Sequence, residues 1–412
     1  MSTRAGDSIL VQDYLPSRRS LRISVVTETY PPEINGVAAT SVRVVEGLRA
    51  KGHELQLVRP RQSGDESPAG AEGYAEVLMR GLPIPRYPQL RMGLPSRQAL
   101  AKLWQTRRPD VVHIVTEGPL GWSALQAARQ LRLPVVSDFR TNFHAYSRHY
   151  GVAWLRRPVM AYLRKFHNAT ACTMVPTDAL RAELAAAGFK SLRVVARGVD
   201  VQAYDAAHRS EALRAAWGAG PRTMVALSVG RLAPEKNLGL VIEALQAMRL
   251  EYSDMQLVFV GDGPDKARLM QMYPDAVFAG MRRGADLAAH YASADVFLFP
   301  SETETFGNVV PEAMASGLAV VAYAHAAAGQ LIRHGENGLL ARAGESAEFC
   351  RVARRLAGEL THARELGGKA RITAQGLDWS RIVEAVESEY GAAISARAAA
   401  VRAAWDGALP AA

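Results

Sequence analysis

Short apolar runs alternate with helical segments along this chain, and this alternation constrains the fold more than any other feature. In the first series, an apolar run at 22–28 is followed by a segment at 37–51 with helical spacing and a second run at 54–59. After about residue 200 the pattern restarts, with apolar runs at 223–229, 256–260, 276–279, 294–299 and 318–323. Near-continuous apolar strands between helices are typical of parallel sheets covered on both faces. We therefore predict an α/β chain with two doubly wound parallel sheets.

The length agrees with two domains, because 412 residues are too many for one ordinary hydrophobic core. The polar start, residues 1–20, is predicted to be a disordered tail. We predict an N-terminal Rossmann-like domain at 21–200 and a C-terminal one at 201–375. The last segment, 376–412, is Ala-rich and is predicted to be helical and able to cross back onto the first domain.

Composition points to a cytoplasmic protein. No apolar run reaches the roughly 18–20 residues that a membrane span needs. The only two cysteines, Cys172 and Cys350, are far apart and form neither a disulfide framework nor a metal-binding pattern. A reducing compartment is therefore expected.

The net charge of +9 is concentrated in the first half of the chain. Residues 77–109 carry seven Lys and Arg residues and no acid. A second basic segment, 152–166, has an apolar stripe at helical spacing, which fits either a core-facing side or a helix lying on an anionic membrane. The basic half therefore predicts an anionic partner, such as an acidic membrane surface.

Ligands of open parallel sheets bind beyond the carboxyl ends of the strands, so the loops there are the candidate sites. The loop at 300–317 carries Glu304 and Glu312, with Phe306-Gly307-Asn308 between them at a predicted helix start. Backbone N–H groups at a helix start suit a phosphate, and a carboxylate can hold the two hydroxyls of a ribose. Paired glutamates are common on helix surfaces, so this pattern alone does not specify a site.

Two further loops carry groups that suit phosphate. Gly230 ends a strand, and Arg231 and Lys236 follow on the loop, where both can neutralise a diphosphate. Gly36 follows the first strand and allows backbone to approach a phosphate. The Gly-rich stretch at 261–264 lacks the third glycine of a dinucleotide fingerprint, so we reject a nicotinamide site there.

Together these loops resemble those of glycosyltransferase family 4, whose members have the GT-B fold: two Rossmann-like domains facing across a cleft. The resemblance covers roughly 22–375. Its motifs are the spaced pair Glu304 and Glu312, the loop GRLAPEKN at 230–237 and the glycine loop TETYPPEING at 27–36. The segments at 116–121 and 139–143 are similar to a subgroup of mannosyltransferases and sulfoquinovosyl transferases that act on membrane lipids.

The resemblance implies a role for each matching residue. Glu312 is expected to hold the nucleotide ribose, and Glu304 to contact the donor sugar. Arg231 and Lys236 are expected to bind the diphosphate. Backbone groups are expected to complete the site: Phe306, Gly307 and Asn308 at sugar and phosphate, Gly36 at phosphate, Gly230 at the loop exit and Gly280 at the base.

The resemblance also implies the reaction. The family moves a hexose from a nucleoside-diphosphate sugar, here GDP-mannose or a UDP-sugar, to a hydroxyl of a lipid or glycan acceptor with retention of configuration. Front-face attack needs no protein nucleophile, so Glu304 is expected to bind sugar rather than attack it. Neither a metal nor a cofactor is implied, and the enzyme is expected in the cytoplasm with possible peripheral contact to the membrane. No oligomeric state is indicated.

One position departs from the family pattern. Many relatives have a histidine where this chain has Arg140, and the nearest histidine is His144. Either His144 takes the place of the family's histidine near the reacting carbon, or Arg140 replaces it with a fixed positive charge. Arginine cannot act as a general base at neutral pH.

Two other classes of protein remain open at this point. One is a sugar-nucleotide epimerase or another enzyme of the GT-B fold, which would turn over the donor without an acceptor. The other is a non-catalytic protein that binds anions or nucleic acid through its basic half. The sequence shows neither an RNP-like aromatic motif nor a recognition helix, so nucleic acid is not the expected partner.

Overall fold

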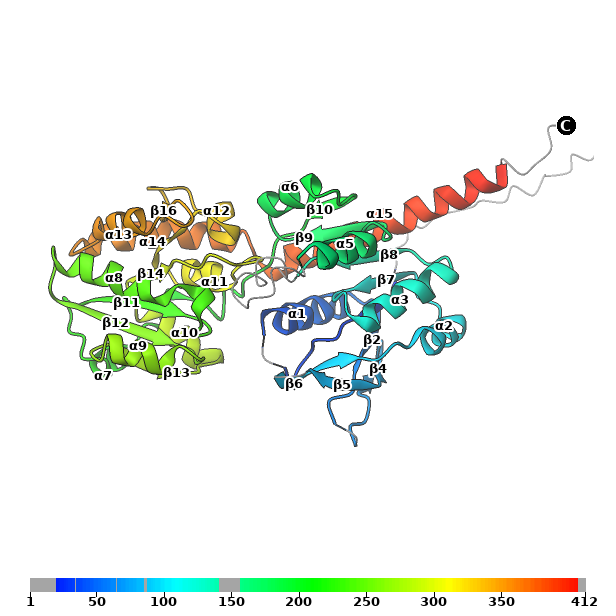
Figure 1. The fold of residues 1–412 in the computed structure, drawn as a ribbon, viewed down its shortest axis with the longest axis horizontal. Coiled ribbons are helices and arrows are strands. Elements are labelled where there is room, and N and C mark those ends of the chain that lie inside the picture. The colour runs from blue at the N-terminus through cyan, green and yellow to red at the C-terminus, as the bar shows by residue number, and fades with distance from the viewer. Residues whose placement is uncertain (1–19, 34, 64, 85–86, 141–155, 407–412) are drawn as a thin grey trace, which may run out of the picture.

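The chain folds into two α/β halves that lie side by side, joined at a narrow waist (Figure 1). This computed structural model describes residues 20–33, 35–63, 65–84, 87–140 and 156–406. The predicted tail at 1–20 therefore lies outside the described residues, except for Ser20. Figure 1 also shows the last helix, α15 (Trp379–Asp406), running from the waist across the first half.

The first half is built on an eight-stranded sheet with the order β10-β9-β8-β7-β1-β2-β4-β3. All neighbouring strands run parallel except β3 and β4. Chain order reverses between β1 and β7, which makes this the switch point of the sheet. Its strands are β1 (Arg22–Val26), β2 (Glu54–Pro60), β3 (Gly70–Ala71), β4 (Tyr74–Met79), β7 (Val111–Ile114), β8 (Val135–Asp138), β9 (Cys172–Val175) and β10 (Leu192–Val194).

Helices cover both faces of this sheet, which explains why its strands are apolar on both sides. Ile23 and Val25 of β1 pack with Val44 of α1, whereas Val26 packs with Leu100 of α2 on the opposite face. Successive residues of a strand point to opposite faces, so a sheet between two helix layers needs continuous apolar runs. The helices of this half are α1 (Gly36–Ala50), α2 (Arg97–Thr106), α3 (Pro119–Gln130), α5 (Arg156–His167) and α6 (Asp178–Ala186).

A small antiparallel hairpin, β5 (Gly81–Ile84) and β6 (Tyr87–Gly93), adds to the first half and was not expected from the sequence. It occupies part of the acid-free basic segment. The sequence has prolines at 83, 85 and 88, and proline lacks the N–H that a central strand needs. The parallel-strand pattern therefore could not predict this segment.

The second half is built on a six-stranded parallel sheet with the order β13-β12-β11-β14-β15-β16. This is the 3-2-1-4-5-6 order of a dinucleotide-binding sheet, with its switch point between β11 and β14. Its strands are β11 (Met224–Val229), β12 (Met255–Val260), β13 (Val277–Gly280), β14 (Val296–Phe299), β15 (Ala319–Tyr323) and β16 (Leu339–Ala341). The predicted fold class, two doubly wound parallel sheets, is confirmed.

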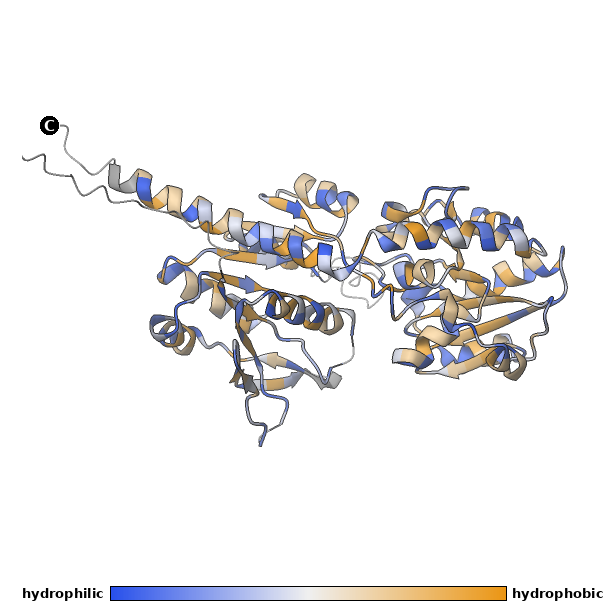
Figure 2. Ribbon diagram, turned by 180° about the vertical axis from the view of Figure 1, so that it is seen from behind, coloured by the Kyte–Doolittle hydropathy of each residue, from blue (hydrophilic) through white to orange (hydrophobic). Residues whose placement is uncertain are grey.

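Alternating residues of β11 enter two separate cores. Met224 and Ala226 pack in one cluster, and Val225 and Leu227 in the other. Figure 2 shows predominantly hydrophobic residues in the strands, whereas hydrophilic and hydrophobic residues alternate along the long helix α15. The covering helices are α7 (Glu211–Ala216), α8 (Leu238–Arg249), α9 (Lys266–Met272), α10 (Gly284–Ala292), α11 (Val309–Ala315), α12 (Ala326–Leu331), α13 (Ser346–Arg354) and α14 (Leu360–Gln375).

The chain crosses between the halves twice, and the two crossings lie together. Val199 donates its N–H to the carbonyl of Leu377 at 3.0 Å. The second crossing leads into α15, where Val383, Val386 and Tyr390 pack in the same core as α1. The described part of the last helix therefore packs with the first half.

Candidate functional site

The switch point of the second sheet brings together two of the loops singled out from the sequence. One loop follows β11 and contains Arg231 and Lys236, and the other follows β14 and contains Glu304. Lys236 ends a short 3-10 turn (Pro234–Lys236), and its Nζ forms an ion pair with Glu304 Oε1. Ser301 Oγ donates to the same oxygen at 2.8 Å. Glu304 is thus held by two donors and is largely buried, in the crevice where a ligand of such a sheet is expected.

Arg231 lies on the same loop as Lys236 and is half-exposed. Its Nη1 lies 3.8 Å from Oε1 of Glu235, which is buried. The other oxygen of Glu235, Oε2, is buried and has no hydrogen-bond partner among the described residues. The two cations that the sequence assigned to a diphosphate therefore lie on one loop and point toward carboxylates of the same crevice.

The strand ends beside this loop are tightly joined through backbone. Gly230 donates its N–H to Val260 O at 2.9 Å, and Gly261 donates to Gly280 O at 2.9 Å. Gly261 has φ 135°, and a Cβ there would overlap the carbonyl of Gly230. A Cβ on Gly230 or Gly280, by contrast, would meet no atom within 4 Å. Backbone at these two positions borders open space, which leaves room for a flat group such as a nucleobase.

Glu312 lies in the first turn of α11, the helix that follows the loop carrying Glu304. Its Oε2 accepts a hydrogen bond from the hydroxyl of Tyr291 at 2.8 Å, and Tyr204 packs edge-on against that tyrosine. Burial raises the pKa of Glu312 to about 7, although the bond from Tyr291 acts in the opposite direction. Among the described residues the carboxylate has no second hydrogen-bond partner, so it can accept bonds from a ligand's hydroxyls.

The two halves meet at Gly36 and Asn308. A Cβ on Gly36 would lie 3.5 Å from Asn308 Nδ2. Asn35 accepts hydrogen bonds from the N–H groups of Val37 and Ala38, so α1 begins at Gly36 with its amino end toward this contact. Asn308 Oδ1 is buried and has no partner within the described ranges. The structure thus faces the glycine loop of the first half toward the Phe306-Gly307-Asn308 loop of the second.

The position that departs from the family pattern, Arg140, is buried and fixed by a chain of contacts. Its Nε donates to Asp138 Oδ2 at 2.7 Å, and the same oxygen lies 2.9 Å from His113 Nε2. His113 Nδ1 in turn lies 2.8 Å from the hydroxyl of Tyr390 on α15. Burial opposes ionisation of Asp138, but Arg140 and His113 outweigh it and hold the pKa of Asp138 below its usual range. His144, the alternative, lies outside the described residues.

The sequence missed one charged residue of this region. Arg197 lies on the first crossing between the halves, and its guanidinium carbon is 5.7 Å from the centre of the Phe306 ring. No motif marks it. The only signal was its position at the predicted domain boundary, because a residue on a crossing necessarily lies near the cleft.

The switch point of the first sheet also carries a buried acid. Glu28 follows β1, and its Oε1 accepts the N–H of Leu120 at 2.7 Å at the start of α3. Burial raises the pKa of Glu28 to about 7, and the nearby charge of Glu117 adds to this. The Glu28 side chain lies at the C-terminal ends of the first sheet's strands, where the acceptor substrate is expected to bind.

In the described part of the basic segment, residues 156–166, the apolar stripe is largely a core side, whereas residues 152–155 lie outside the described residues. Within α5, Leu163 and Phe166 are buried in two clusters of the first half, and Val159 packs beside Leu163. Tyr162 is partly exposed and donates to the carbonyl of Glu117. In α5, the apolar side chains that could insert into a membrane are therefore mostly buried in the protein core.

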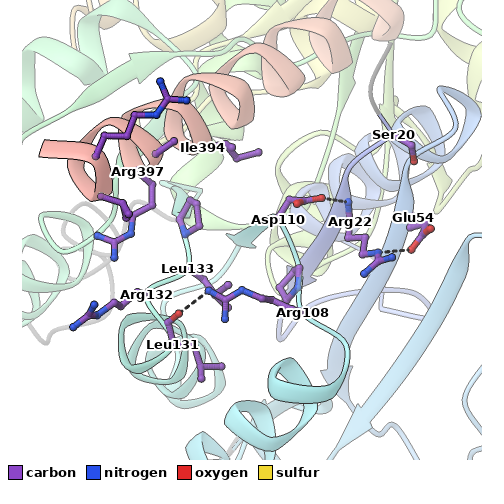
Figure 3. Close-up of a pocket in the computed structure, with 15 residues that line it drawn as sticks. Ser20, Arg22, Glu54, Arg108, Asp110, Leu131, Arg132, Leu133, Ile394 and Arg397 are labelled. Carbon is purple, nitrogen blue, oxygen red and sulfur yellow. Dashed lines mark hydrogen bonds and ion pairs between the residues drawn. The ribbon is translucent and has the colours of Figure 1, made fainter. Parts of the chain in front are cut away.

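A separate cavity of about 920 Å³ lies at the opposite edge of the first sheet, between the strand starts and α15 (Figure 3). Arg22 pairs with Glu54 there, and Arg108 donates to the carbonyl of Leu131. Arg132 and Arg397 also line it. It lies at the amino ends of β1, β7 and β8, so it is not the crevice in which a sheet of this kind binds its ligand.

The described residues contain neither a candidate membrane-spanning helix nor a cluster of metal-ligating side chains. Across residues 20–406, with the gaps given above, no helix is both long and apolar enough to cross a bilayer. In the same ranges, no three His, Cys, Asp or Glu side chains gather as a metal site would require.

Comparison with protein families matches both halves. The family described as "Glycosyltransferase Family 4" matches residues 34–203, and "Glycosyl transferases group 1" matches residues 223–359. Together the two matches cover every strand of both sheets except β1.

Three characterised proteins are similar over most of their length. A GDP-mannose-dependent alpha-mannosyltransferase of Mycobacterium tuberculosis is 38% identical, over 79% of this chain and 85% of that protein. Sulfoquinovosyl transferase SQD2 of Arabidopsis thaliana is 30% identical, over 90% and 74%. Alpha-monoglucosyldiacylglycerol synthase of Acholeplasma laidlawii is 28% identical, over 77% and 84%. The predicted family resemblance is confirmed.

Solved structures share the fold. Sucrose-phosphate synthase of Thermosynechococcus elongatus superposes with a TM-score of 0.75 at 18% identity, covering 92% of this chain and all of that one. At this identity the likeness concerns the fold, and it confirms the GT-B arrangement of two Rossmann-like domains.

Proposed function

This chain belongs to glycosyltransferase family 4, and from that premise we propose that it transfers mannose from GDP-mannose to a hydroxyl of a membrane lipid or glycan, with retention of configuration. That it is a glycosyltransferase using a nucleotide sugar follows from the family. The observation that carries the proposal is the switch point between β11 and β14, where Lys236 of one loop pairs with Glu304 of the other. The helix that follows, α11, carries the buried Glu312, which accepts a bond from Tyr291. The choice of GDP-mannose is supported by the mannosyltransferase that is 38% identical.

We assign the donor contacts as follows. The Glu312 carboxylate accepts bonds from the ribose hydroxyls, and Gly280 backbone borders the base. Arg231 and Lys236 bind the diphosphate. Glu304 and the Phe306-Gly307-Asn308 loop meet the sugar and its phosphate, with Gly36 approaching from the first half. Two observations support this arrangement: the open space at Gly230 and Gly280, and the single hydrogen bond that the Glu312 carboxylate makes among the described residues.

The reaction then needs no nucleophile from the protein. The bond between the sugar's C1 and the β-phosphate oxygen breaks, and its electron pair leaves with the phosphate. The acceptor oxygen bonds to C1 on the same face, and its proton passes to the departing phosphate. Lys236 and Arg231 stabilise the negative charge that develops there. Glu304 is held by Lys236 and Ser301, which favours binding of the sugar over attack on it.

We propose that these two cations supply the positive charge that a metal would otherwise supply, so that turnover continues in EDTA. We also propose that Arg140, anchored on Asp138, provides a fixed positive charge where relatives have histidine. A role for His144 remains a prediction from the sequence.

The acceptor is proposed to lie at the carboxyl edge of the first sheet, near Glu28. The excess of Lys and Arg in that half favours an anionic membrane surface, and a diacylglycerol-related relative supports a lipid acceptor. Because the apolar side of α5 is largely buried, such contact would rest on charged residues. We propose domain boundaries near residues 200 and 376, where the two crossings lie.

The test is a transfer assay with the purified full chain. GDP-mannose and UDP-glucose, each labelled in the sugar, are incubated with bacterial lipid extract in EDTA, and the product's anomeric configuration is read by NMR. We expect mannose in an α-linked lipid product, lost in Glu312→Ala and retained in Arg132→Gln, which changes an exposed arginine far from the crevice.

The other outcomes contradict parts of the proposal. Transfer only from UDP-glucose would overturn the choice of donor. A β-linked product would overturn retention, and dependence on added metal would overturn metal independence. Conversion of the donor sugar without an acceptor would favour an epimerase and overturn the transfer reaction.

A further inference from the structure

Arg197 occupies a fixed place at the junction of the two halves. It follows β10 on the first crossing, two residues before Val199, which pairs with the returning chain beside Leu377. A Cβ on the neighbouring Gly198 would lie only 2.6 Å from the Trp379 ring. The backbone of this crossing is therefore packed closely against the start of α15, and Arg197 cannot shift far from the junction.

The Arg197 side chain is 8% exposed and has no hydrogen bond or ion pair within the described residues. Its Nη2 in particular is buried without a partner. Burial, together with the charge of Arg140 nearby, lowers the pKa of Arg197 to about 9. Buried guanidinium groups are normally paired, because an unpaired buried charge destabilises the fold.

The two carboxylates near Arg197 are engaged elsewhere. Asp138 is bound by His113 and Arg140. Glu304 is bound by Lys236 and Ser301. Among the described residues neither carboxylate forms a hydrogen bond or ion pair with Arg197, so the acceptors for its guanidinium come from outside the described residues.

The surroundings of Arg197 belong to the donor loop. Its guanidinium lies over Phe306, the first residue of the Phe306-Gly307-Asn308 loop, and Glu304 is among the charges that act on it. The Asn308 side chain of the same loop also has a buried oxygen without a partner in the described ranges. Unsatisfied buried groups thus gather on the side of the crevice where the sugar-bearing end of the donor is placed.

We propose that Arg197 is a third cation of the donor site, which binds the sugar-bearing phosphate of the nucleoside diphosphate from the side opposite Arg231 and Lys236. This rests on the proposed function. Guanidinium offers several N–H donors to one phosphate and stays charged throughout the reaction. When the C1–O bond breaks, the electron pair remains on that phosphate's oxygen, and Arg197 stabilises the added charge. Because Arg197 lies on a crossing, the bound phosphate joins both halves.

The test compares GDP with GMP, since only GDP carries the sugar-bearing phosphate. Calorimetry on the full chain gives both dissociation constants for the wild type, Arg197→Met, Arg197→Lys and the control Arg132→Gln. In Arg197→Met we expect GDP to bind about 10- to 100-fold more weakly and GMP less than about threefold more weakly. Arg197→Lys should retain part of the difference, and the control should match the wild type.

Thermal unfolding of the same variants separates binding from folding. A structural arginine would lower the melting temperature when replaced. An arginine kept for phosphate should leave it unchanged or raised in Arg197→Met, because an unpaired buried charge is removed.

Three results overturn the inference. One is an unchanged ratio of GDP to GMP affinity in Arg197→Met, with the wild type binding GDP. Another is a weaker apparent affinity for the acceptor with unchanged GDP binding, which would assign Arg197 to the acceptor. The third is a lower melting temperature in both Arg197 variants with normal GDP binding. If the wild type binds neither GDP nor UDP, the proposed function itself fails.

Discussion

The buried charged groups at the two ends of the second sheet differ in how many hydrogen-bond partners they have. At the amino end, Arg214 is 1% exposed, and its two terminal nitrogens make four hydrogen bonds, to Asp295, Ser293, Thr223 and Gly220. Asp295 accepts in addition from the N–H of Val225 at 2.9 Å. This arginine ties the start of the sheet together.

At the carboxyl end, buried polar atoms stay without partners among the described residues. They include Glu235 Oε2, Asn308 Oδ1 and Arg197 Nη2, together with the hydroxyls of Thr303 and Tyr323. Buried groups are nearly always hydrogen-bonded, so a cluster of exceptions is informative. The difference is one of degree, because Arg214 also has one buried nitrogen, Nε, without a hydrogen bond, beside four bonds on its other nitrogens. Arg197 makes none among the described residues, so the number of partners distinguishes the two arginines where burial and charge do not.

The largest effect is expected at the amino end. Arg214→Met leaves Asp295 with fewer donors in the core, so we expect the free energy of unfolding to fall by about 3 kcal/mol, measured by urea denaturation. Turnover per folded molecule should be unchanged. If Arg214→Met were as stable as the wild type, Arg214 would not be a structural residue and the proposed difference between the two ends of the sheet would fail.

At the carboxyl end, Lys236→Ala should have the reverse signature. We expect kcat for transfer to fall by about 10²- to 10³-fold because charge on the leaving diphosphate loses its partner. The midpoint of urea unfolding should move little. A large loss of stability with normal kcat would make Lys236 a structural residue like Arg214.

Glu312, at the carboxyl end of the sheet, should make the affinity for the nucleotide depend on pH. The raised pKa of about 7 means that this carboxyl is largely protonated at pH 6 in the free protein, whereas ribose hydroxyls favour the carboxylate. Affinity for GDP should therefore rise about tenfold from pH 6 to pH 8. Glu312→Gln, titrated calorimetrically beside the wild type, should lose this dependence; the same slope in both would contradict the assignment.

The raised pKa of Glu312 also affects folding: as the pH rises, nucleotide binding should strengthen but the stability of the fold should decrease. The folded carboxyl holds its proton more tightly than the unfolded one, whose pKa is near 4.5. The contribution of Glu312 to stability therefore decreases as the pH rises from about 4.5 to 7, and the cost remains above that range. Replacement by glutamine should flatten this part of the stability profile.

The smallest effect is expected at Tyr390, which connects α15 to Arg140 through His113 and Asp138. Tyr390→Phe removes one buried hydrogen bond, so the free energy of unfolding should fall by about 1 kcal/mol. If the chain of contacts also positions Arg140, kcat should fall a few-fold while the KM for the donor is unchanged. No change in either quantity would show that Arg140 is positioned by Asp138 alone.

Much of the fold was predictable because its signal is local. The apolar runs that became β11 and β12 are continuous, since Met224 and Val225 enter cores on opposite faces. The loops at 230–237 and 300–308 could also be picked out, because they follow strands and carry charges. The hairpin at 81–93 was missed since its prolines break the strand pattern.

Contacts between distant segments were not predictable in the same way. The approach of Gly36 to Asn308 and the contact of Tyr390 with His113 depend on how the two halves pack. Arg197 could not be distinguished from other arginines in the sequence, because the absence of a partner is a property of the folded chain. The roles of Glu304, Glu312, Arg231 and Lys236 remain predictions that the arrangement of the crevice supports.

The central claim is that the crevice beyond β11 and β14 binds the nucleotide of the donor. Calorimetric titration of the purified chain with GDP and with UDP, both in EDTA, tests it most directly, with Glu312→Ala beside the wild type. We expect one binding site, preference for GDP and at least about tenfold weaker binding in the variant. Binding of neither nucleotide, or equal binding by wild type and Glu312→Ala, would contradict it.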